Sequence, residues 1–139
     1  MKKNIISIVA STLVFGLVSI NALAQSATVF PSKTITLVVP FTPSSGSDII
    51  ARIIAPKLAT KWGQPVIVDN KPGASGNLGA QSVVKAAPDG HTLLMAINTF
   101  TMTPAIYKNL GFDPISDFSP IAKLAESGFA FAVNPTVPV

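Results

Sequence analysis

The most constraining feature of this sequence is a strand–loop–helix unit that occurs more than once. Residues 33–40 (Lys-Thr-Ile-Thr-Leu-Val-Val-Pro) are rich in β-branched and apolar residues, which is typical of a strand buried on both faces. A loop of Pro, Ser and Gly follows, and residues 48–61 then carry apolar side chains at helical spacing. This alternation indicates an α/β fold with a parallel, doubly wound sheet. The further elements that we expect are a strand at 65–69, a helix at 77–86 and a strand at 91–96.

The helix predicted at 48–61 has recognisable ends. Ser45 or Ser47 can supply the oxygen that caps its first turn, and Gly63 is suited to the left-handed conformation that ends a helix. Pro56 lies inside the predicted helix, where it removes one backbone hydrogen bond and favours a kink.

The chain becomes less regular after its third predicted strand. We expect residues 97–103 to form a polar loop that ends before Pro104, and residues 107–120, with their glycine and prolines, to wrap the surface. Residues 128–133 (Gly-Phe-Ala-Phe-Ala-Val) predict a fourth strand. Residues 134–139 are interpreted as the start of a segment that crosses to another lobe.

The N-terminus has the layout of a secretory signal peptide. Lys2 and Lys3 precede the almost wholly apolar residues 5–20, and Asn-Ala-Leu-Ala at 21–24 provides small residues for cleavage after Ala24. A membrane anchor is the alternative, but the apolar stretch is shorter than the roughly 20 residues of a spanning helix. The chain has no cysteine, which excludes a lipid anchor and suits an exported protein that folds without disulfides. We therefore expect a cleaved leader at 1–24 and a periplasmic protein.

The charge of the chain gives little support to nucleic-acid binding. Removing the two lysines of the leader lowers the formal net charge from +4 to +2. The remaining basic residues are scattered singly, without a stripe or interleaved aromatic residues. A mildly positive body is compatible with an anionic ligand.

Three loops follow the predicted strands, at residues 41–47, 71–76 and 97–101. All three are rich in residues of the set Gly, Ser, Thr, Asn and Pro, with no charged side chain at their centres. In open α/β sheets, ligands bind beyond the carboxyl ends of the strands, where backbone N–H groups at helix N-termini can hold an anion. Ordinary turns between a strand and a helix use the same residues for capping. Any one of these loops, taken alone, could therefore be such a turn. The three loops together favour a binding site.

Other chemistries have little support in the sequence. Gly73, Gly76 and Gly79 have the wrong spacing for a dinucleotide-binding turn, and no phosphate-binding P-loop is present. His91 is the only histidine and is expected to be solvated at the start of a strand, so neither a zinc cluster nor a histidine-based catalytic centre is indicated. No nucleophile elbow is present. We therefore predict neither an enzyme nor a cofactor.

Three further side chains have structural interpretations. Asp48 at the start of the first helix complements the helix dipole, and it is also in a position to shape the ligand loop. Trp62 and Tyr107 are expected to be packing residues rather than stacking platforms for a ligand.

Four segments in order resemble the receptors of the tripartite tricarboxylate transporters, the Bug-type periplasmic binding proteins. They are residues 36–52, 63–79, 87–94 and 107–120. The resemblance implies two α/β lobes that close over a small carboxylate and deliver it to a membrane transporter component or a sensor. Residues 25–133 would then be a partial first lobe. In this family the carboxylate is held largely by backbone amides and ordered water.

The resemblance also implies which residues contact the ligand. The first loop matches at Phe41, Thr42, Ser44, Ser45 and Ser47, with Asp48 at the helix start; the second loop matches at Ala74, Ser75 and Gly76; and the third matches at Asn98 and Thr99.

The chain departs from the family pattern in two ways. The family usually has Pro-Gly-Gly where this chain has Pro43-Ser44-Ser45, and the loss of two glycines removes easy access to positive φ. Family members are about twice this length or more, as two lobes require. A truncated remnant of such a receptor is therefore an alternative, and a small exported α/β hydrolase is another.

Overall fold

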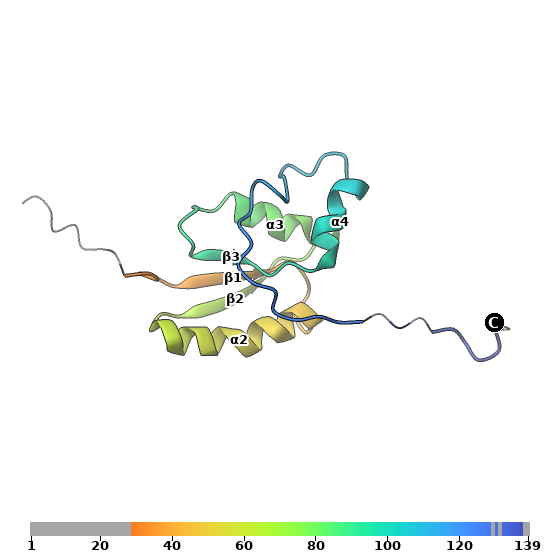
Figure 1. Ribbon diagram of the computed structural model, residues 1–139, viewed down its shortest axis with the longest axis horizontal. Coiled ribbons are helices and arrows are strands. Elements are labelled where there is room, and N and C mark those ends of the chain that lie inside the picture. The colour runs from red at the N-terminus through yellow and green to blue at the C-terminus, as the bar shows by residue number, and fades with distance from the viewer. Residues whose placement is uncertain (1–28, 129, 131, 138–139) are drawn as a thin grey trace, which may run out of the picture.

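A parallel sheet with helices on both faces forms the body of the protein (Figure 1). The computed structural model describes residues 29–128, 130 and 132–137. The predicted leader therefore lies outside the described residues. The elements in chain order are β1 (Ile35–Val39), α2 (Gly46–Trp62), β2 (Val66–Asn70), the 3₁₀ turn η1 (Ala74–Gly76), α3 (Asn77–Val84), β3 (Thr92–Leu94) and α4 (Asn98–Ile106).

The strand order is β2-β1-β3, and β1 pairs in parallel with both neighbours. The chain moves to one side of β1 through α2 and then returns across it through α3. Because parallel crossovers are right-handed, this reversal places the two helices on opposite faces of the sheet. Figure 1 shows this arrangement, with α2 on one side and α3 and α4 on the other. The predicted doubly wound α/β class is confirmed.

The central strand carries most of the core. Ile35, Val38 and Val39 of β1 are at most 1% exposed, although their side chains alternate between the two faces. This burial confirms the prediction that the first strand is covered on both sides. The strand is buried in this way because α2 packs on one face of the sheet and α3 on the other.

Helix α2 has the predicted ends but a different buried face. Ser45 Oγ accepts a hydrogen bond from the Asp48 amide at 3.4 Å, and Gly63 ends the helix at φ 66°. The helix continues through Pro56. The residues nearest the sheet are Ala51 and Ala55, because only small side chains fit at the closest approach, so half of the predicted isoleucine stripe points outward.

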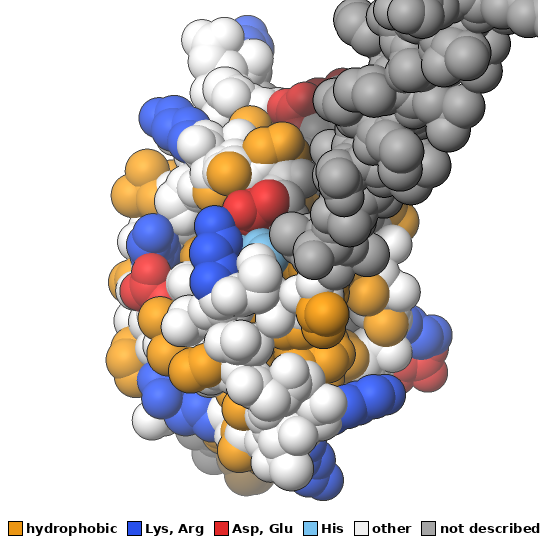
Figure 2. Space-filling model, turned by 90° about the vertical axis from the view of Figure 1, so that its left-hand side faces the viewer, with side chains coloured by type: hydrophobic (Ala, Val, Ile, Leu, Met, Phe, Trp, Pro, Cys, Tyr) orange, Lys and Arg blue, Asp and Glu red, His pale blue; other side chains and the backbone are white. Residues whose placement is uncertain are grey.

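The exposed half of that stripe consists of Ile49 and Ile53, which are 52% and 55% exposed. Ile67 of β2 is exposed to a similar extent. Figure 2 shows apolar side chains reaching the surface at several separate places on one face, interspersed with Lys and Arg.

None of the helices formed by the described residues is long and apolar enough to cross a membrane.

The prediction of a loop at 97–103 is wrong, because these residues lie largely within α4. Pro104 stands near the end of this helix and lacks the N–H that would bond the Phe100 carbonyl. The Thr103 hydroxyl donates to that carbonyl at 2.5 Å and to Thr99 O at 3.1 Å. The side chain thus gives the Phe100 carbonyl a donor in place of the missing backbone N–H, and the helix continues to Ile106.

Two other predictions differ from the structure. The described residues of 128–133 form no strand and have no sheet neighbour. His91 is only 7% exposed rather than solvated: its Nε2 accepts from the Ser32 amide at 3.2 Å, and its ring packs 5.1 Å from that of Phe30. The imidazole is buried because residues preceding β1 fold over it.

The segment at 107–120 has no helix or strand and wraps the surface, as predicted. Phe112 and Phe118 contact Phe100 of α4 at ring-centroid distances of 6.1 and 5.0 Å. This aromatic cluster holds the segment against α4. Trp62 packs edge-on against Phe30, in agreement with its predicted packing role.

Candidate functional site

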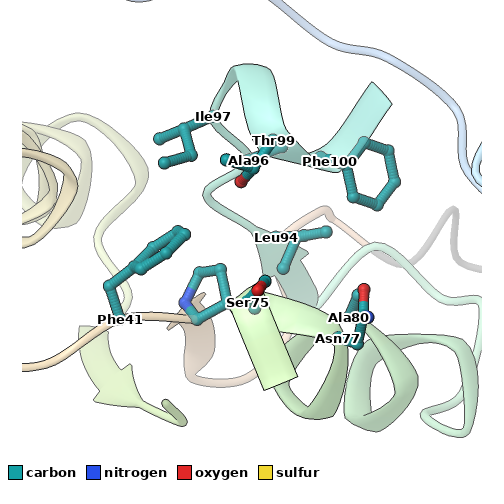
Figure 3. Close-up of a pocket in the computed structure, with 11 residues that line it drawn as sticks. Phe41, Ser75, Asn77, Ala80, Leu94, Ala96, Ile97, Thr99 and Phe100 are labelled. Atoms are coloured by element: carbon teal, nitrogen blue, oxygen red, sulfur yellow. The ribbon is translucent and has the colours of Figure 1, made fainter. Parts of the chain in front are cut away.

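An open pocket lies beyond the carboxyl ends of β1 and β3 (Figure 3). It is a shallow, open hollow, and its space of about 230 Å³ includes open solvent. All three predicted loops contribute to it. Its lining residues are Pro40, Phe41, Ser75, Gly76, Asn77, Ala80, Leu94, Ala96, Ile97, Thr99 and Phe100.

The topology explains why these loops meet. The chain leaves β1 towards α2 on one face and leaves β3 towards α4 on the other, so a crevice opens between the two strand ends. Helix α3 begins at the same edge. A Cβ added to Gly79 would lie 2.6 Å from Pro40 Cβ, so the absence of a side chain lets α3 approach the end of β1.

The pocket offers polar groups but no charged side chain. Ser75, Asn77 and Thr99 bring the hydroxyl and amide groups, and Asn77 is buried. Ser75 Oγ lies 3.0 Å from the Tyr107 hydroxyl, so Tyr107 contacts the second loop. In the part of the chain that the structure describes, no group of three or more His, Asp or Glu side chains could hold a metal ion.

Two helices begin at the pocket without a side-chain cap. Gly76 precedes α3 and Ile97 precedes α4, and neither supplies a capping oxygen. In α2, by contrast, the Ser45 side chain caps the first turn. Some first-turn N–H groups are bonded within the protein, since the Thr99 amide donates to Asn98 Oδ1 and the Asn77 amide donates to Ala74 O. The dipoles of both helices still place partial positive charge at the pocket, which favours a bound anion.

Positive-φ residues other than glycine occur only in the first two loops, as far as the described residues go. They are Ser44 at 67°, Ala74 at 47° and Ser75 at 57°. Such conformations cost of order 1–3 kcal/mol for a residue with a side chain and tend to gather at binding sites. The strain is therefore concentrated beside the pocket.

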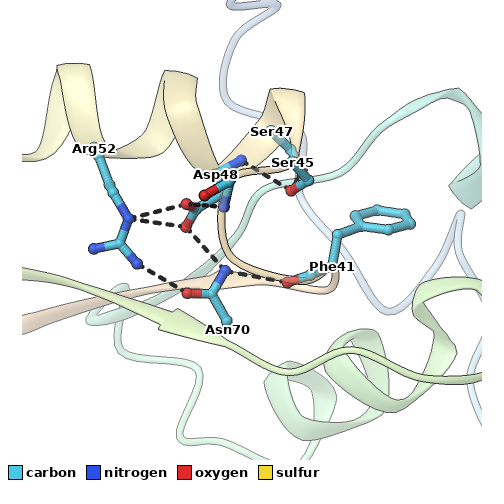
Figure 4. A network of polar contacts seen from close by, with 7 residues as sticks. Phe41, Ser45, Ser47, Asp48, Arg52 and Asn70 are labelled. Atoms are coloured by element: carbon cyan, nitrogen blue, oxygen red, sulfur yellow. Dashed lines mark hydrogen bonds and ion pairs between the residues drawn. The ribbon is translucent and has the colours of Figure 1, made fainter.

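The first loop is held by a polar network beneath it (Figure 4). The Asp48 carboxylate accepts hydrogen bonds from the Ser44 amide at 2.8 Å, from Arg52 Nε at 3.0 Å and from Asn70 Nδ2 at 2.9 Å. These hydrogen bonds lower the pKa of Asp48 from 3.8 to about 2. The bond from the Arg52 guanidinium has the largest effect, followed by those from the Ser44 and Asn70 amides. Asp48 is 2% exposed and ionised at neutral pH, so its oxygens are already engaged within the protein.

The structure brings together four of the residues that the resemblance pointed to. Phe41, Ser75, Gly76 and Thr99 line the pocket. The others lie beside it and are not among the lining residues: Thr42, Ser44, Ser45, Ser47, Asp48, Ala74 and Asn98.

Several of these neighbours have structural roles. Ser45 caps α2, and Ser47 Oγ lies 3.3 Å from Ser45 Oγ. The Asn98 side chain accepts from the Thr99 amide at 3.1 Å. These side chains therefore shape the loops that form the wall of the pocket.

Sequence reasoning missed Phe100 and Asn77 in the pocket and the pair Arg52 and Asn70 beneath the first loop. Phe100 lies within the third predicted loop but was not among the residues named there. Asn70 carried a usable signal, because it is a polar residue at the carboxyl end of a buried strand, the edge where ligand loops gather.

Comparisons with known proteins identify the class of protein to which this fold belongs. A family model described as the tripartite tricarboxylate transporter family receptor matches residues 50–139. A UPF0065 protein of Bordetella pertussis is 43% identical over 118 residues, covering 84% of this chain and 36% of that protein. A UPF0065 protein of Cupriavidus necator is 39% identical over 132 residues, covering 95% and 40%. The chain belongs to the tripartite tricarboxylate transporter receptor family.

Solved structures give the same fold. The periplasmic binding protein BugD matches with a TM-score of 0.63 at 37% identity, covering 66% of this chain and 31% of that one. MatC from Rhodopseudomonas palustris, solved with bound malate, matches with a TM-score of 0.63 at 40% identity, covering 68% and 33%. The chain spans about a third of the length of the relatives that it matches.

Proposed function

We propose that this chain is a periplasmic receptor for a small carboxylate, which it binds in the pocket between its three loops. The observation that carries this proposal is that two helices, α3 and α4, begin at one uncharged pocket that all three polar loops line. The partial positive charge of the two helix N-termini would stabilise a carboxylate there without a basic side chain.

The other lining residues suit the same ligand. The Ser75 and Thr99 hydroxyls can donate to a carboxylate oxygen, and Asn77 can contribute its amide. Phe41, Ile97 and Phe100 form apolar walls. Low surrounding polarity strengthens each hydrogen bond to the ligand.

Export and delivery complete the proposal. The leader would be cleaved after Ala24, and the loaded receptor would deliver its ligand to a tripartite transporter component in the membrane or to a sensor. Two related structures support the ligand class, since one is described with malate and the other, a second protein from R. palustris, with adipate. As a binding protein, the chain would carry out no chemical step.

A thermal-melt screen tests the proposal. The chain is expressed from its full sequence in a Gram-negative host, purified from the periplasmic extract and melted with a panel of mono- and dicarboxylates. A carboxylate at about 100 times its Kd should raise the midpoint by on the order of 10 °C, because it binds only the folded state.

Two variants connect any shift to the pocket. Ser75→Ala and Thr99→Val should reduce the shift, whereas Thr60→Val, which alters an exposed hydroxyl on α2, should preserve it. The proposal is contradicted if no carboxylate raises the midpoint, or if all three variants behave alike.

A further inference from the structure

Asn70, the last residue of β2, joins the end of that strand to the first loop. Its Nδ2 donates to Phe41 O at 3.1 Å and to Asp48 Oδ1 at 2.9 Å, and its Oδ1 accepts from Arg52 Nη2 at 3.0 Å. These two acceptors and one donor fix the orientation of the Asn70 amide. If the amide were flipped, its oxygen would face the Phe41 and Asp48 oxygens.

Arg52 orients this amide and the carboxylate at the same time. Its Nε donates to both Asp48 oxygens, at 3.0 and 3.1 Å, while Nη2 reaches Asn70. A planar guanidinium can make these bonds together, and a lysine ammonium cannot reproduce their geometry.

The network fixes both ends of the turn that carries Phe41. Asn70 holds the Phe41 carbonyl, and Asp48 holds the Ser44 amide in its left-handed conformation. The Phe41 ring extends away from the network, as Figure 4 shows, and faces the pocket in Figure 3. The ring also approaches the second loop, since a Cβ added to Gly76 would lie 3.4 Å from Phe41 Cζ.

We propose that Asn70, oriented by Arg52 and Asp48, is a positioning residue that sets the Phe41 ring in the wall of the ligand pocket. It acts through the backbone of the first loop and touches no ligand. The inference rests on the proposed function for its effect on affinity, but the placement of Phe41 is a property of the free protein. The two can therefore be tested separately.

The experiment compares the wild type with Asn70→Ala, Arg52→Lys and a control. The control is Asp89→Asn, because Asp89 is also a carboxylate that accepts from a cation, Lys33 Nζ at 2.8 Å, and from a backbone amide, His91 N at 3.0 Å. It precedes the amino end of β3, whereas the pocket lies beyond the carboxyl ends of β1 and β3. The readouts are calorimetric affinity for the best carboxylate of the panel and the NOE between the Phe41 ring and Gly76 in ligand-free protein.

Asn70→Ala should weaken binding roughly tenfold and Arg52→Lys roughly threefold to tenfold, the scale of one or two lost hydrogen bonds. Both should weaken the Phe41–Gly76 NOE. Asp89→Asn should lower the melting midpoint while changing affinity less than about twofold and keeping the NOE.

Wild-type affinity and an intact NOE in both network variants would overturn the proposal. Losses of affinity in the control that match those of the network variants would also overturn it, because the effect would then follow stability alone. If no carboxylate binds the wild type, the proposed function fails, and the NOE decides the positioning role by itself.

Discussion

Ser44 adopts a left-handed conformation at φ 67°, at a position where the family resemblance led us to expect glycine. The sequence predicted that losing this glycine would remove easy access to positive φ, and the chain keeps the conformation nevertheless. The Asp48 carboxylate accepts the Ser44 amide at 2.8 Å and so offsets part of the cost. Ser45, the second replacement, has φ −68° and caps α2, so only one of the two serines is strained.

Ser44→Gly should therefore stabilise the protein. A left-handed residue with a Cβ costs about 1–2 kcal/mol, and the greater chain entropy of glycine cancels about half of the gain. We expect the free energy of unfolding, measured by urea denaturation, to rise by about 0.5–1 kcal/mol. Ser45→Ala is the contrast, since removing a helix cap should lower it by about 1 kcal/mol. Equal effects of the two substitutions would contradict this assignment.

Asp48 should also make stability depend on pH. Its pKa is about 2 in the folded protein, below the ordinary 3.8, so its contribution is complete above pH 4 and is lost as the pH falls towards 2. In Asp48→Asn, the urea midpoint should fall less steeply between pH 4 and pH 2 than in the wild type. A residual slope should remain, because hydrogen bonds also lower the pKa of Asp89 and Asp113. An unchanged slope in the variant would show that Asp48 is not linked in this way.

Helices and strands show where sequence patterns succeed and where they stop. The β-branched run of β1 and the cap and stop of α2 were predictable, because local chemistry decides them. The formation of α4 was not, because Pro104 is usually a helix breaker and the compensating Thr103 hydroxyl bond depends on geometry. The buried face of α2 was also hidden, since alanines rather than isoleucines occupy the closest approach to the sheet.

The contact between α3 and the end of β1 is tested by adding one methyl group. Gly79→Ala would bring a Cβ to 2.6 Å from Pro40 Cβ and 2.9 Å from its Cα, so α3 must shift. We expect a loss of about 1–3 kcal/mol in the free energy of unfolding, with weaker carboxylate binding because α3 borders the pocket. Gly46→Ala is the matched control: its added Cβ meets nothing within 4 Å, and alanine in place of a helical glycine should stabilise by about 0.5–1 kcal/mol. If both substitutions change the free energy of unfolding in the same direction, the contact between α3 and the end of β1 is not critical.

For the molecule as a whole, the gathering of three loops at one edge was predictable from the order of strands and helices. The loops carry no charged side chain at their centres, and the resulting pocket has none in its lining. Which members of each loop face the pocket was not predictable, because that depends on left-handed turns at Ser44 and Ser75. The Arg52–Asn70 pair was missed for a related reason: it joins residues 18 positions apart through side chains alone.

The most direct test of the account is a carboxylate titration followed by ¹H–¹⁵N NMR of the chain purified from periplasm. If the pocket between the three loops is the binding site, the largest amide shifts should fall on Gly76, Asn77 and Thr99, with Asp89 and its neighbours unchanged. Amide shifts centred elsewhere, or none at saturating carboxylate, would contradict the account.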